Sequence, residues 1–427
     1  METVSREGCL ENKCGERRQE GAPSRFAIYV SVAYIGTLMS RFGSLDPELI
    51  QSGGCTDVYF PRCESVLERA GVNPSVVMEV SVASLPLGFG ILAGLDAVLD
   101  LFAGMPVSVS AMPEGSIFFP DEPVMVISGK YRDFGRFETA LLGFLCHASG
   151  IATAAAHVVS VAGGRPIYSF GSRRQHPAIA PMIERSAWIG GVAAVSNTAA
   201  PEDIPLAGTM PHAFVLSFDT PEAAWAAYAE HADPEVPRIM LCDTLSDEKA
   251  EALAAARIGC AAVRLDTPRS RRGDIRSIIG EVRWELDTHG YRDVQIFLSG
   301  GVTAADVAAL RDLVDAFGVG GAIANAPVID FSADIIEKDG IPIAKRGRRS
   351  GQKQVWRLPG GHRITLPAGR QPPEAGAETE RETGAVPLLQ PCIQDGRIIT
   401  GTTADAARRR ADEEMQLYGG GGPHLRG

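Results

Sequence analysis

Short apolar runs alternate with longer segments of helical spacing from about residue 166 to residue 333. The expected strands are Ile167–Phe170, Ala193–Ser196, Ala213–Phe218, Arg238–Cys242, Ala261–Leu265, Gln295–Leu298 and Ala316–Val319. The expected helices include Pro221–His231, Asp247–Ile258, Asp274–Thr288 and Ala304–Leu313. Continuous apolar strands joined by helices form a parallel sheet with both faces covered. The number of repeated units favours an α/β barrel over residues 166–333 rather than an open sheet.

The region from residue 25 to residue 165 has a different pattern, with alternating strands expected at 76–84, 107–112 and 124–128. Two helices should follow, Phe137–Gly150 and Ile151–Ala162. This order predicts an N-terminal α+β domain with a helical linker. Residues 1–24 are polar and charged and predict a disordered tail, and residues 26–39 alternate as a strand would.

The chain after residue 333 predicts a separate C-terminal segment over residues 334–403. It contains a basic run from Lys345 to Lys353, then Val355-Trp356-Arg357, then a flexible linker over about 370–387. Residues 404–427 are charged and then rich in glycine, which predicts a second disordered tail.

Composition limits the classes of function. The chain has 427 residues, of which 45% are hydrophobic and 22% charged, so two or three domains with a large core are expected. The net charge of −11 argues against nucleic-acid or membrane-surface partners. The eight cysteines are scattered and are expected to act as small hydrophobes. The sequence shows neither a signal peptide nor an apolar run expected to span a bilayer, which predicts a cytoplasmic protein.

Polar residues follow several expected strands, at the end where an α/β barrel carries its chemistry. Arg173 and Arg174 follow the first strand, and guanidinium groups hold carboxylate or phosphate oxygens in pairs. His212 lies in a glycine-bounded turn and is a candidate proton or phosphoryl carrier. Taken singly, these residues are better explained as a surface arginine pair and a core histidine. The repetition of polar strand ends is what favours a site.

Glycine pairs and carboxylates complete the polar strand ends. Gly300-Gly301 and Gly320-Gly321 follow the last two strands, where backbone N–H groups commonly hold a phosphate. Asp243 and Asp266 suit Mg²⁺, and equally suit helix capping. Arg264 shares a strand face with Asp266 and has the charge to hold a diphosphate. Phe170 and Tyr59 are candidates to stack on a flat ring, with core packing as the simpler explanation.

The joint order of the motifs resembles the nicotinate phosphoribosyltransferases, most closely their shorter archaeal-type members, from about Asp46 to Arg363. The motifs are Thr56–Phe60, Phe134 to Leu145, Ser169–Pro177, Gly208–His212, Arg264–Thr267, Leu298–Gly301 and Lys345–Arg357. The resemblance implies a type II phosphoribosyltransferase fold, with an N-terminal α+β sandwich domain, an irregular seven-stranded α/β barrel and a C-terminal segment. It also implies a homodimer or higher oligomer with active sites shared between subunits.

The resemblance further implies roles for individual residues. His212 corresponds to a histidine that ATP phosphorylates, with Asp243 beside it, and Arg264 and Asp266 position phosphoribosyl diphosphate. The residues expected at the ring substrate are Phe170, Arg173, Arg174, Asn197, Asp57 and Tyr59, the last from the other subunit. The residues expected at phosphates are Gly300, Gly301, Gly320, Gly321, Lys345 and Lys353. Mg²⁺, held by Asp243 and Asp266, and ATP as co-substrate are the implied cofactors.

Two departures from the family pattern stand out. Archaeal-type members can carry a cysteine-rich zinc knuckle after the Val-Trp-Arg segment, whereas here only Cys392 lies beyond it, so we expect no structural zinc. Gly321 stands where a hydroxyl residue is common. The implied activity is transfer of phosphoribose to nicotinate, with ATP hydrolysis, in NAD salvage. The alternatives are a decarboxylating quinolinate phosphoribosyltransferase, a nicotinamide-using paralogue and a catalytically silent nucleotide-binding paralogue.

Overall fold

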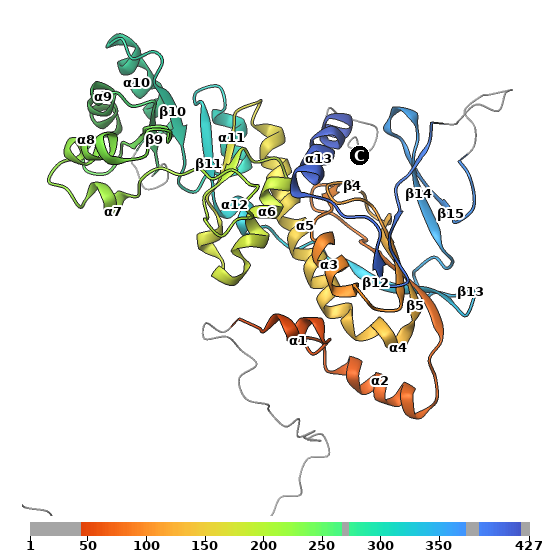
Figure 1. The fold of residues 1–427 in the computed structure, drawn as a ribbon. Helices are drawn as coiled ribbons and strands as arrows, with labels where there is room; N and C mark the ends of the chain where they lie inside the picture. Colours follow the sequence, from red (N-terminus) through yellow and green to blue (C-terminus); the bar gives the residue numbers. More distant parts are fainter. Residues whose placement is uncertain (1–43, 267–272, 373–383, 420–427) are drawn as a thin grey trace, which may run out of the picture. The chain divides into compact units, whose positions relative to one another are not determined.

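The computed structural model describes residues 44–266, 273–372 and 384–419 (Figure 1). Residues from Pro47 onwards form one compact unit, which begins with α1 (Pro47–Gln51) and α2 (Tyr59–Arg69). The tail expected at residues 1–24 and the strand expected at 26–39 lie outside the described residues.

The first sheet has seven strands in the order β13-β12-β1-β5-β3-β17-β18, and all neighbours are antiparallel. Its strands are β1 (Ser75–Ser81), β3 (Val107–Ala111), β5 (Pro123–Lys130), β12 (Ser332–Lys338), β13 (Ile341–Pro342), β17 (Gln390–Gln394) and β18 (Arg397–Ile398). Strand β3 alternates buried and half-buried residues, as a strand with one face on the core does. Four of these strands, β12, β13, β17 and β18, begin at or after Ser332, so the C-terminal segment completes the N-terminal sheet.

Smaller elements surround this sheet. They are β2 (Gly90–Ile91) paired with β4 (Ile117–Phe118), α3 (Leu95–Phe102), and a sheet of β14 (Lys353–Arg357), β15 (Arg363–Pro367) and β16 (Val386–Pro387). Helix α3 buries Leu95, Val98, Leu99 and Phe102 on one side, which is the spacing of an amphipathic helix. The basic run therefore leads into a paired strand. Part of the expected linker, residues 373–383, lies outside the described residues.

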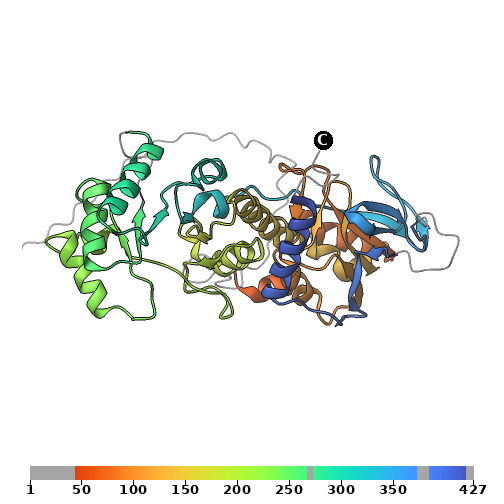
Figure 2. The same ribbon diagram turned by 90° about the horizontal axis from the view of Figure 1, so that it is seen from above.

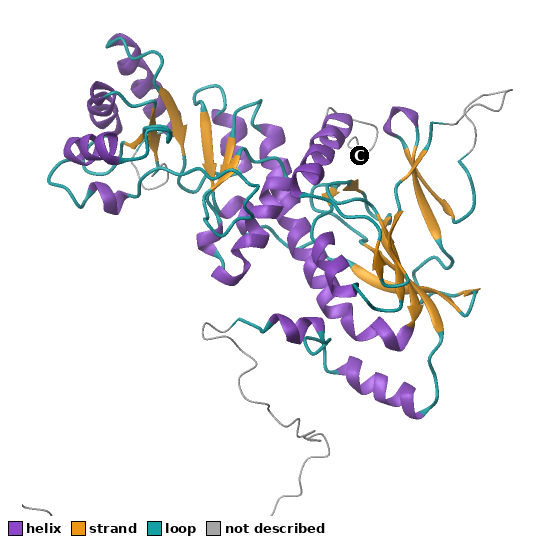
Figure 3. Cartoon of the chain, in the orientation of Figure 1, coloured by secondary structure: helices purple, strands orange, loops and turns teal. Residues whose placement is uncertain are grey.

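The second sheet is parallel, with the order β7-β6-β11-β10-β9-β8. Its strands are β6 (Ile167–Ser169), β7 (Ala194–Val195), β8 (Ile239–Leu241), β9 (Ala262–Leu265), β10 (Gln295–Leu298) and β11 (Ala316–Val319). The helices around it are α6 (Ala180–Ile189), α8 (Pro221–His231), α9 (Glu248–Ile258), α10 (Ile275–Thr288), α11 (Ala304–Leu310) and α12 (Gly321–Ala324). Figure 3 shows helices beside these strands. The alternation of strands and helices predicted from the sequence is confirmed.

The expected seventh strand and the closed barrel are wrong for the described residues. The run expected as strand Ala213–Phe218 forms helix α7 (His212–Val215) instead. Phe214 lies against Phe218 and Tyr228, with ring centroids 5.3 and 5.9 Å apart, so the aromatic side chains of this run pack against each other and against α8 without strand pairing. Strands β7 and β8 stand at the two edges of the sheet. The sheet is therefore a curled half-barrel of six strands.

Helix α5 (Glu138–Val161) joins the two halves and is continuous where two helices were expected. It contacts α3 and β2 on one side and α6, α11 and α12 on the other (Figure 1). A side chain at Gly150 would place its Cβ 2.5 Å from the carbonyl oxygen of Pro327. Gly150 therefore permits close packing of the helix against another backbone segment and does not end the helix.

By length and composition, the helical stretch Tyr131–Val161 is apolar enough to cross a membrane, contrary to the expectation of no such run. It begins with α4 (Tyr131–Phe134) and a short 3₁₀ turn before α5. More than half of its most apolar stretch is buried inside the structure. Its apolar character is accounted for by its place between the two halves of the chain.

The disordered tail expected from residue 404 is wrong over α13 (Ala404–Gly419). Ala404, Ala407, Ala411 and Tyr418 are buried, so a narrow apolar stripe runs through an otherwise charged helix. The helix packs beside α6 and α5 (Figure 2). Trp188 Nε1 donates to Asp405 Oδ1 at 2.9 Å. Small alanines carry the stripe, which explains why composition alone suggested disorder.

Candidate active site

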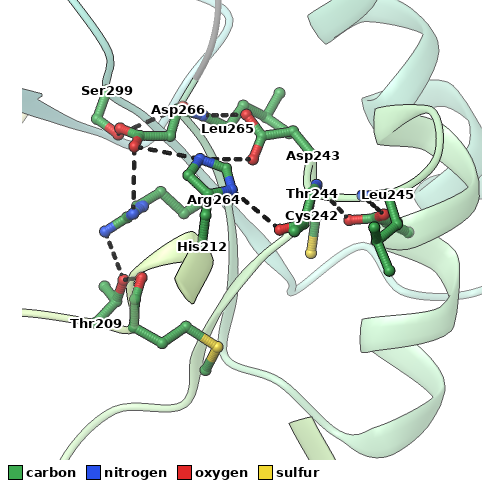
Figure 4. Close-up of polar contacts among 12 residues, drawn as sticks. Thr209, His212, Cys242, Asp243, Thr244, Leu245, Arg264, Leu265, Asp266 and Ser299 are labelled. Atoms are coloured by element: carbon green, nitrogen blue, oxygen red, sulfur yellow. Dashed lines mark hydrogen bonds and ion pairs between the residues drawn. The ribbon is translucent and has the colours of Figure 1, made fainter. Parts of the chain in front are cut away.

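The carboxyl ends of β8, β9 and β10 bring four chemical groups together (Figure 4). Leu241 pairs with Arg264 and Leu265 pairs with Leu298, so these parallel strands end at one edge. Asp243, Asp266 and Ser299 follow the three strands within two residues. His212 reaches the same point from the start of α7. The edge of the half-barrel thus gathers residues that are far apart in sequence.

His212 is the centre of this group. Its Nε2 lies 3.8 Å from Asp243 Oδ1 and 3.6 Å from Asp266 Oδ2, and its Nδ1 lies 3.1 Å from Thr244 Oγ1. The Asp243 side chain is 1% exposed and that of Asp266 is 29% exposed, while the histidine ring is 32% exposed. A positive charge that develops on the imidazole would therefore be stabilised by two carboxylates, in a site from which water is partly excluded.

Arg264 connects this histidine centre to the turn that precedes His212. Its Nη1 donates to Thr209 Oγ1 at 2.6 Å, and its Nη2 lies 3.5 Å from Asp266 Oδ2. Burial lowers the pKa of Arg264, and the positive charge of Arg173 also lowers it, against the opposite effects of Asp266 and Asp243. A buried guanidinium next to a second cationic side chain is suited to an anionic ligand.

Hydrogen bonds fix both carboxylates. The backbone N–H of Asp266 donates to Asp243 Oδ2 at 2.7 Å, and the Ser299 hydroxyl donates to Asp266 Oδ1. Within the described residues, no group of three or more His, Cys, Asp or Glu side chains is placed to hold a metal ion. Two carboxylates still fit Mg²⁺, because this ion commonly takes its remaining oxygens from phosphates and water.

Phe170 and its neighbours form a second part of the site, at the tips of β6, β7 and β11. The half-buried ring of Phe170 stacks on Phe297, with centroids 5.9 Å apart and planes 18° apart. A Cβ at Gly318 would lie 2.5 Å from the Phe170 ring, so glycine is required beneath it. Asn197 Nδ2 donates to Ser172 Oγ at 3.0 Å. Arg173 and Arg174 are exposed in the turn between Phe170 and α6.

The two glycine pairs follow β10 and β11 in turns where a side chain would be strained or crowded. Gly300 and Gly301 have φ values of 89° and 74°, which L side chains rarely adopt. A Cβ at Gly171 would lie 2.6 Å from the Gly320 carbonyl oxygen, so the tips of β6 and β11 approach closely. Gly321 begins α12. These turns can present main-chain N–H groups to a phosphate without a side chain in the way.

Four predicted residues, Asp57, Tyr59, Lys345 and Lys353, lie outside the parallel sheet and its helices. Tyr59 Oη donates to Asp57 Oδ2 at 3.4 Å. Lys345 Nζ pairs with Asp334 Oδ1 at 2.5 Å, and Lys353 Nζ pairs with Glu79 Oε2 at 2.8 Å. Within the described residues, none of these contacts is with His212 or with the glycine pairs. Their assignment to substrate and phosphates stays a prediction.

Two buried glutamates at the site were missed. Glu184 of α6 is 0% exposed, and its Oε2 accepts from Ser169 Oγ at 3.0 Å. Burial raises the pKa of Glu184, against hydrogen bonding from Ser172, Ser169 and the Asn197 N–H. Glu251 of α9 is 3% exposed and accepts backbone N–H groups from the loop after β8. In the sequence, both resemble ordinary charged residues on a helix surface. Only their burial in the fold distinguishes them from the other glutamates.

Comparison with known proteins first defines a class. A family profile described as quinolinate phosphoribosyl transferase, N-terminal domain, matches residues 57–149, and the profile of the C-terminal domain of the same family matches residues 151–334. The second match covers the half-barrel and the whole histidine centre. The two matches together define the chain as a phosphoribosyltransferase of this two-domain type.

Individual relatives identify the family within this class of phosphoribosyltransferases. Nicotinate phosphoribosyltransferase pncB1 of Mycobacterium tuberculosis is 30% identical over 426 residues, covering 88% of this chain and 93% of the relative. The chain belongs to the nicotinate phosphoribosyltransferase family. A solved nicotinate-nucleotide pyrophosphorylase from Pyrococcus furiosus is 46% identical, with a TM-score of 0.86, and the match covers 89% of this chain and 99% of that one. Human nicotinic acid phosphoribosyltransferase shares the fold at a TM-score of 0.68 and 22% identity, over 87% and 95% of the chains.

Proposed function

We propose that the protein transfers phosphoribose from phosphoribosyl diphosphate to nicotinate, giving nicotinate mononucleotide and pyrophosphate, with ATP hydrolysis coupled through His212. The observation that carries the proposal is the convergence of His212, Asp243, Asp266 and Arg264 at the strand ends of the half-barrel. The names of the relatives support the same ring substrate.

The transfer step needs electrostatic stabilisation of a breaking C–O bond. Positive charge develops at the ribose C1 as the diphosphate leaves. Asp266 supplies negative charge near that centre, Arg264 pairs with diphosphate oxygens, and the N–H groups of the glycine pairs hold the 5′-phosphate. Mg²⁺, bound through Asp243 and Asp266, would neutralise charge on the leaving diphosphate. Phe170 stacks on the pyridine ring and Arg173 pairs with its carboxylate, so the ring nitrogen attacks in line.

In the ATP step, the lone pair of a His212 ring nitrogen attacks the terminal phosphorus of ATP. The P–O bond between that phosphorus and ADP breaks, and ADP leaves with the electron pair of this bond. The opposite ring nitrogen keeps its proton, so the ring becomes cationic. Asp243 and Asp266 lie within 3.8 and 3.6 Å of Nε2 and stabilise that charge. Hydrolysis of the N–P bond then returns the neutral histidine.

The active form proposed is a homodimer or higher oligomer in which a second subunit completes each site. Tyr59 is 54% exposed, as expected of a side chain that contacts a second subunit in the oligomer. Leu216 and Leu245, close in sequence to His212 and Thr244, are 57% and 56% exposed. The assigned roles of Tyr59, Asp57, Lys345 and Lys353 depend on this assembly.

The second candidate is a quinolinate phosphoribosyltransferase, because the two matching profiles carry that description. Quinolinate has two carboxylates and needs a larger cationic pocket, and its decarboxylating reaction has no use for a phosphohistidine. The position of His212 between two carboxylates favours the ATP-coupled reaction.

The test replaces the proposed phosphoryl acceptor. His212→Ala should lose ATP hydrolysis and ATP stimulation while retaining part of the ATP-independent transfer. His231→Ala is the matched control, since the His231 side chain is 73% exposed on α8. ATP dependence that survives in His212→Ala would refute the assignment.

A further inference from the structure

The loop that follows β8 is held by one buried carboxylate. Glu251 Oε2 accepts the backbone N–H of Thr244 at 3.0 Å, and Oε1 accepts those of Leu245 and Ser246, both at 2.7 Å. Glu251 is only 3% exposed. Three hydrogen bonds from consecutive N–H groups to a buried charge fix the course of this loop far more firmly than its exposed leucine and serine side chains can.

Glu251 is not needed to cap its own helix. Asp247 is the N-cap of α9, and its Oδ1 accepts the N–H of Ala250 at 2.9 Å. Glu251 lies one turn further along and reaches back to residues that precede the helix. Its carboxylate therefore serves the loop rather than the helix end.

The loop carries a direct partner of His212. Thr244 Oγ1 lies 3.1 Å from His212 Nδ1, and Asp243, the preceding residue, lies 3.8 Å from Nε2. Asp243 Oδ1 and Asp266 Oδ2 lie 3.8 and 3.6 Å from Nε2, beyond hydrogen-bond distance, and their negative charges favour a proton on that nitrogen. In that tautomer Nδ1 is an acceptor, and the Thr244 hydroxyl donates to it until Nδ1 attacks ATP, when this hydrogen bond must be released. The loop thus sets both the orientation of the ring and the position of its proton.

We propose that Glu251 is a positioning residue which, by holding the Thr244–Ser246 loop, fixes the orientation and tautomer of His212 for ATP coupling. The part concerning ATP rests on the proposed function. The part concerning the ring rests on the contacts of His212 with Thr244, Asp243 and Asp266 and on the hydrogen bonds between Glu251 and the loop. A glutamine at position 251 has one acceptor oxygen in place of two and turns an NH₂ group toward N–H donors, so it cannot satisfy all three.

The experiment compares the full-length protein with Glu251→Gln and Thr244→Val, and uses Glu230→Gln, a change at a side chain that is 76% exposed, as control. The ¹⁵N spectrum of histidine-labelled protein at one fixed pH reports the tautomer, and His212→Ala identifies the His212 signals. The wild type and the control should show Nε2 protonated. Both variants should show a mixed tautomer population, with ATP hydrolysis reduced about tenfold and ATP-independent transfer reduced less.

Each result bears on the proposal. An unchanged His212 tautomer in both variants would overturn it, as would transfer with and without ATP falling by the same factor. If Glu251→Gln does not fold, Thr244→Val decides, because it removes one hydroxyl and keeps the shape of the side chain. A wild type without ATP hydrolysis would refute the proposed function alone, since the ¹⁵N spectrum still tests whether the loop holds the ring.

Discussion

Arg185 of α6 holds the half-barrel against the N-terminal half through a buried ion pair. Its Nη1 and Nη2 donate to Glu114 Oε1 and Oε2 at 2.9 and 2.7 Å. Glu114 is 1% exposed and also accepts the N–H of Gly94 at 2.7 Å. Arg185→Ala removes two of these three donors and leaves a carboxylate that water does not reach.

The size of the effect follows from that burial. Breaking a buried pair by removing one partner costs about 3–5 kcal/mol of the free energy of unfolding, because the remaining charge is uncompensated. The same substitution at Arg132 is the control. Arg132 pairs at 3.2 Å with Glu68, whose side chain is 69% exposed, and surface pairs contribute about 0–1 kcal/mol.

The dependence on pH gives a second test of the same cause. Burial raises the pKa of Glu114, and Arg185 lowers it, so Arg185→Ala should raise the pKa of Glu114 further. A carboxyl group with a raised folded-state pKa takes up a proton in the folded state first, so its penalty grows as pH rises and shrinks as pH falls. Urea unfolding at about pH 8 and about pH 5 should show the larger deficit at the higher pH. A loss equal to that of Arg132→Ala, or one independent of pH, would refute the reasoning.

Three further predictions concern single residues. Burial and the charges of Asp334 and Asp57 raise the pKa of Glu138 from 4.5 to about 7, against the charge of Lys345. Glu138→Gln should therefore become more stable relative to the wild type as pH rises through that interval. A difference in the free energy of urea unfolding that stays constant with pH would contradict this. Gly318→Ala should displace the Phe170 ring, which a Cβ would approach to 2.5 Å, and so raise the KM for nicotinate. Gly280→Ala is the control, because a Cβ at Gly280 has open space around it. Equal KM values for the two variants would show that nicotinate does not bind at Phe170. Glu184→Gln removes the charge that accepts from Ser169 and should raise the KM for nicotinate more than that for phosphoribosyl diphosphate; parallel changes in both would point to a general loss of structure.

The sequence predicts the parallel part of the fold well because its strands are buried on both faces. Helix α8 runs over Pro221–His231 as expected, and α9 begins at Glu248 after its cap Asp247. Apolar periodicity, prolines and caps are local signals and need no knowledge of the rest of the chain. The predicted strand ends therefore place Asp243, Asp266 and Arg264 at one edge, where the structure brings them together.

The errors come from features that depend on distant contacts. The apolar pattern of the run after His212 is compatible with a strand or a helix, and packing of Phe214 against Tyr228 accompanies the helix, α7. Gly150 resembles a helix end until Pro327 is seen against it. Helix α13 is largely charged, and its alanine stripe has meaning only beside α6. Pairing of β12 and β17 with β1 and β3 joins residues more than two hundred positions apart, which no local pattern reports.

The most direct test of the central claim is the mass of the product formed by purified protein with phosphoribosyl diphosphate and Mg²⁺. Nicotinate, nicotinamide and quinolinate are each supplied with and without ATP. We predict nicotinate mononucleotide from nicotinate, formed faster with ATP and accompanied by ADP. The same product from quinolinate alone, indifferent to ATP, would contradict the account and leave His212 as a structural residue. Product from none of the three rings would favour a catalytically silent member of the family.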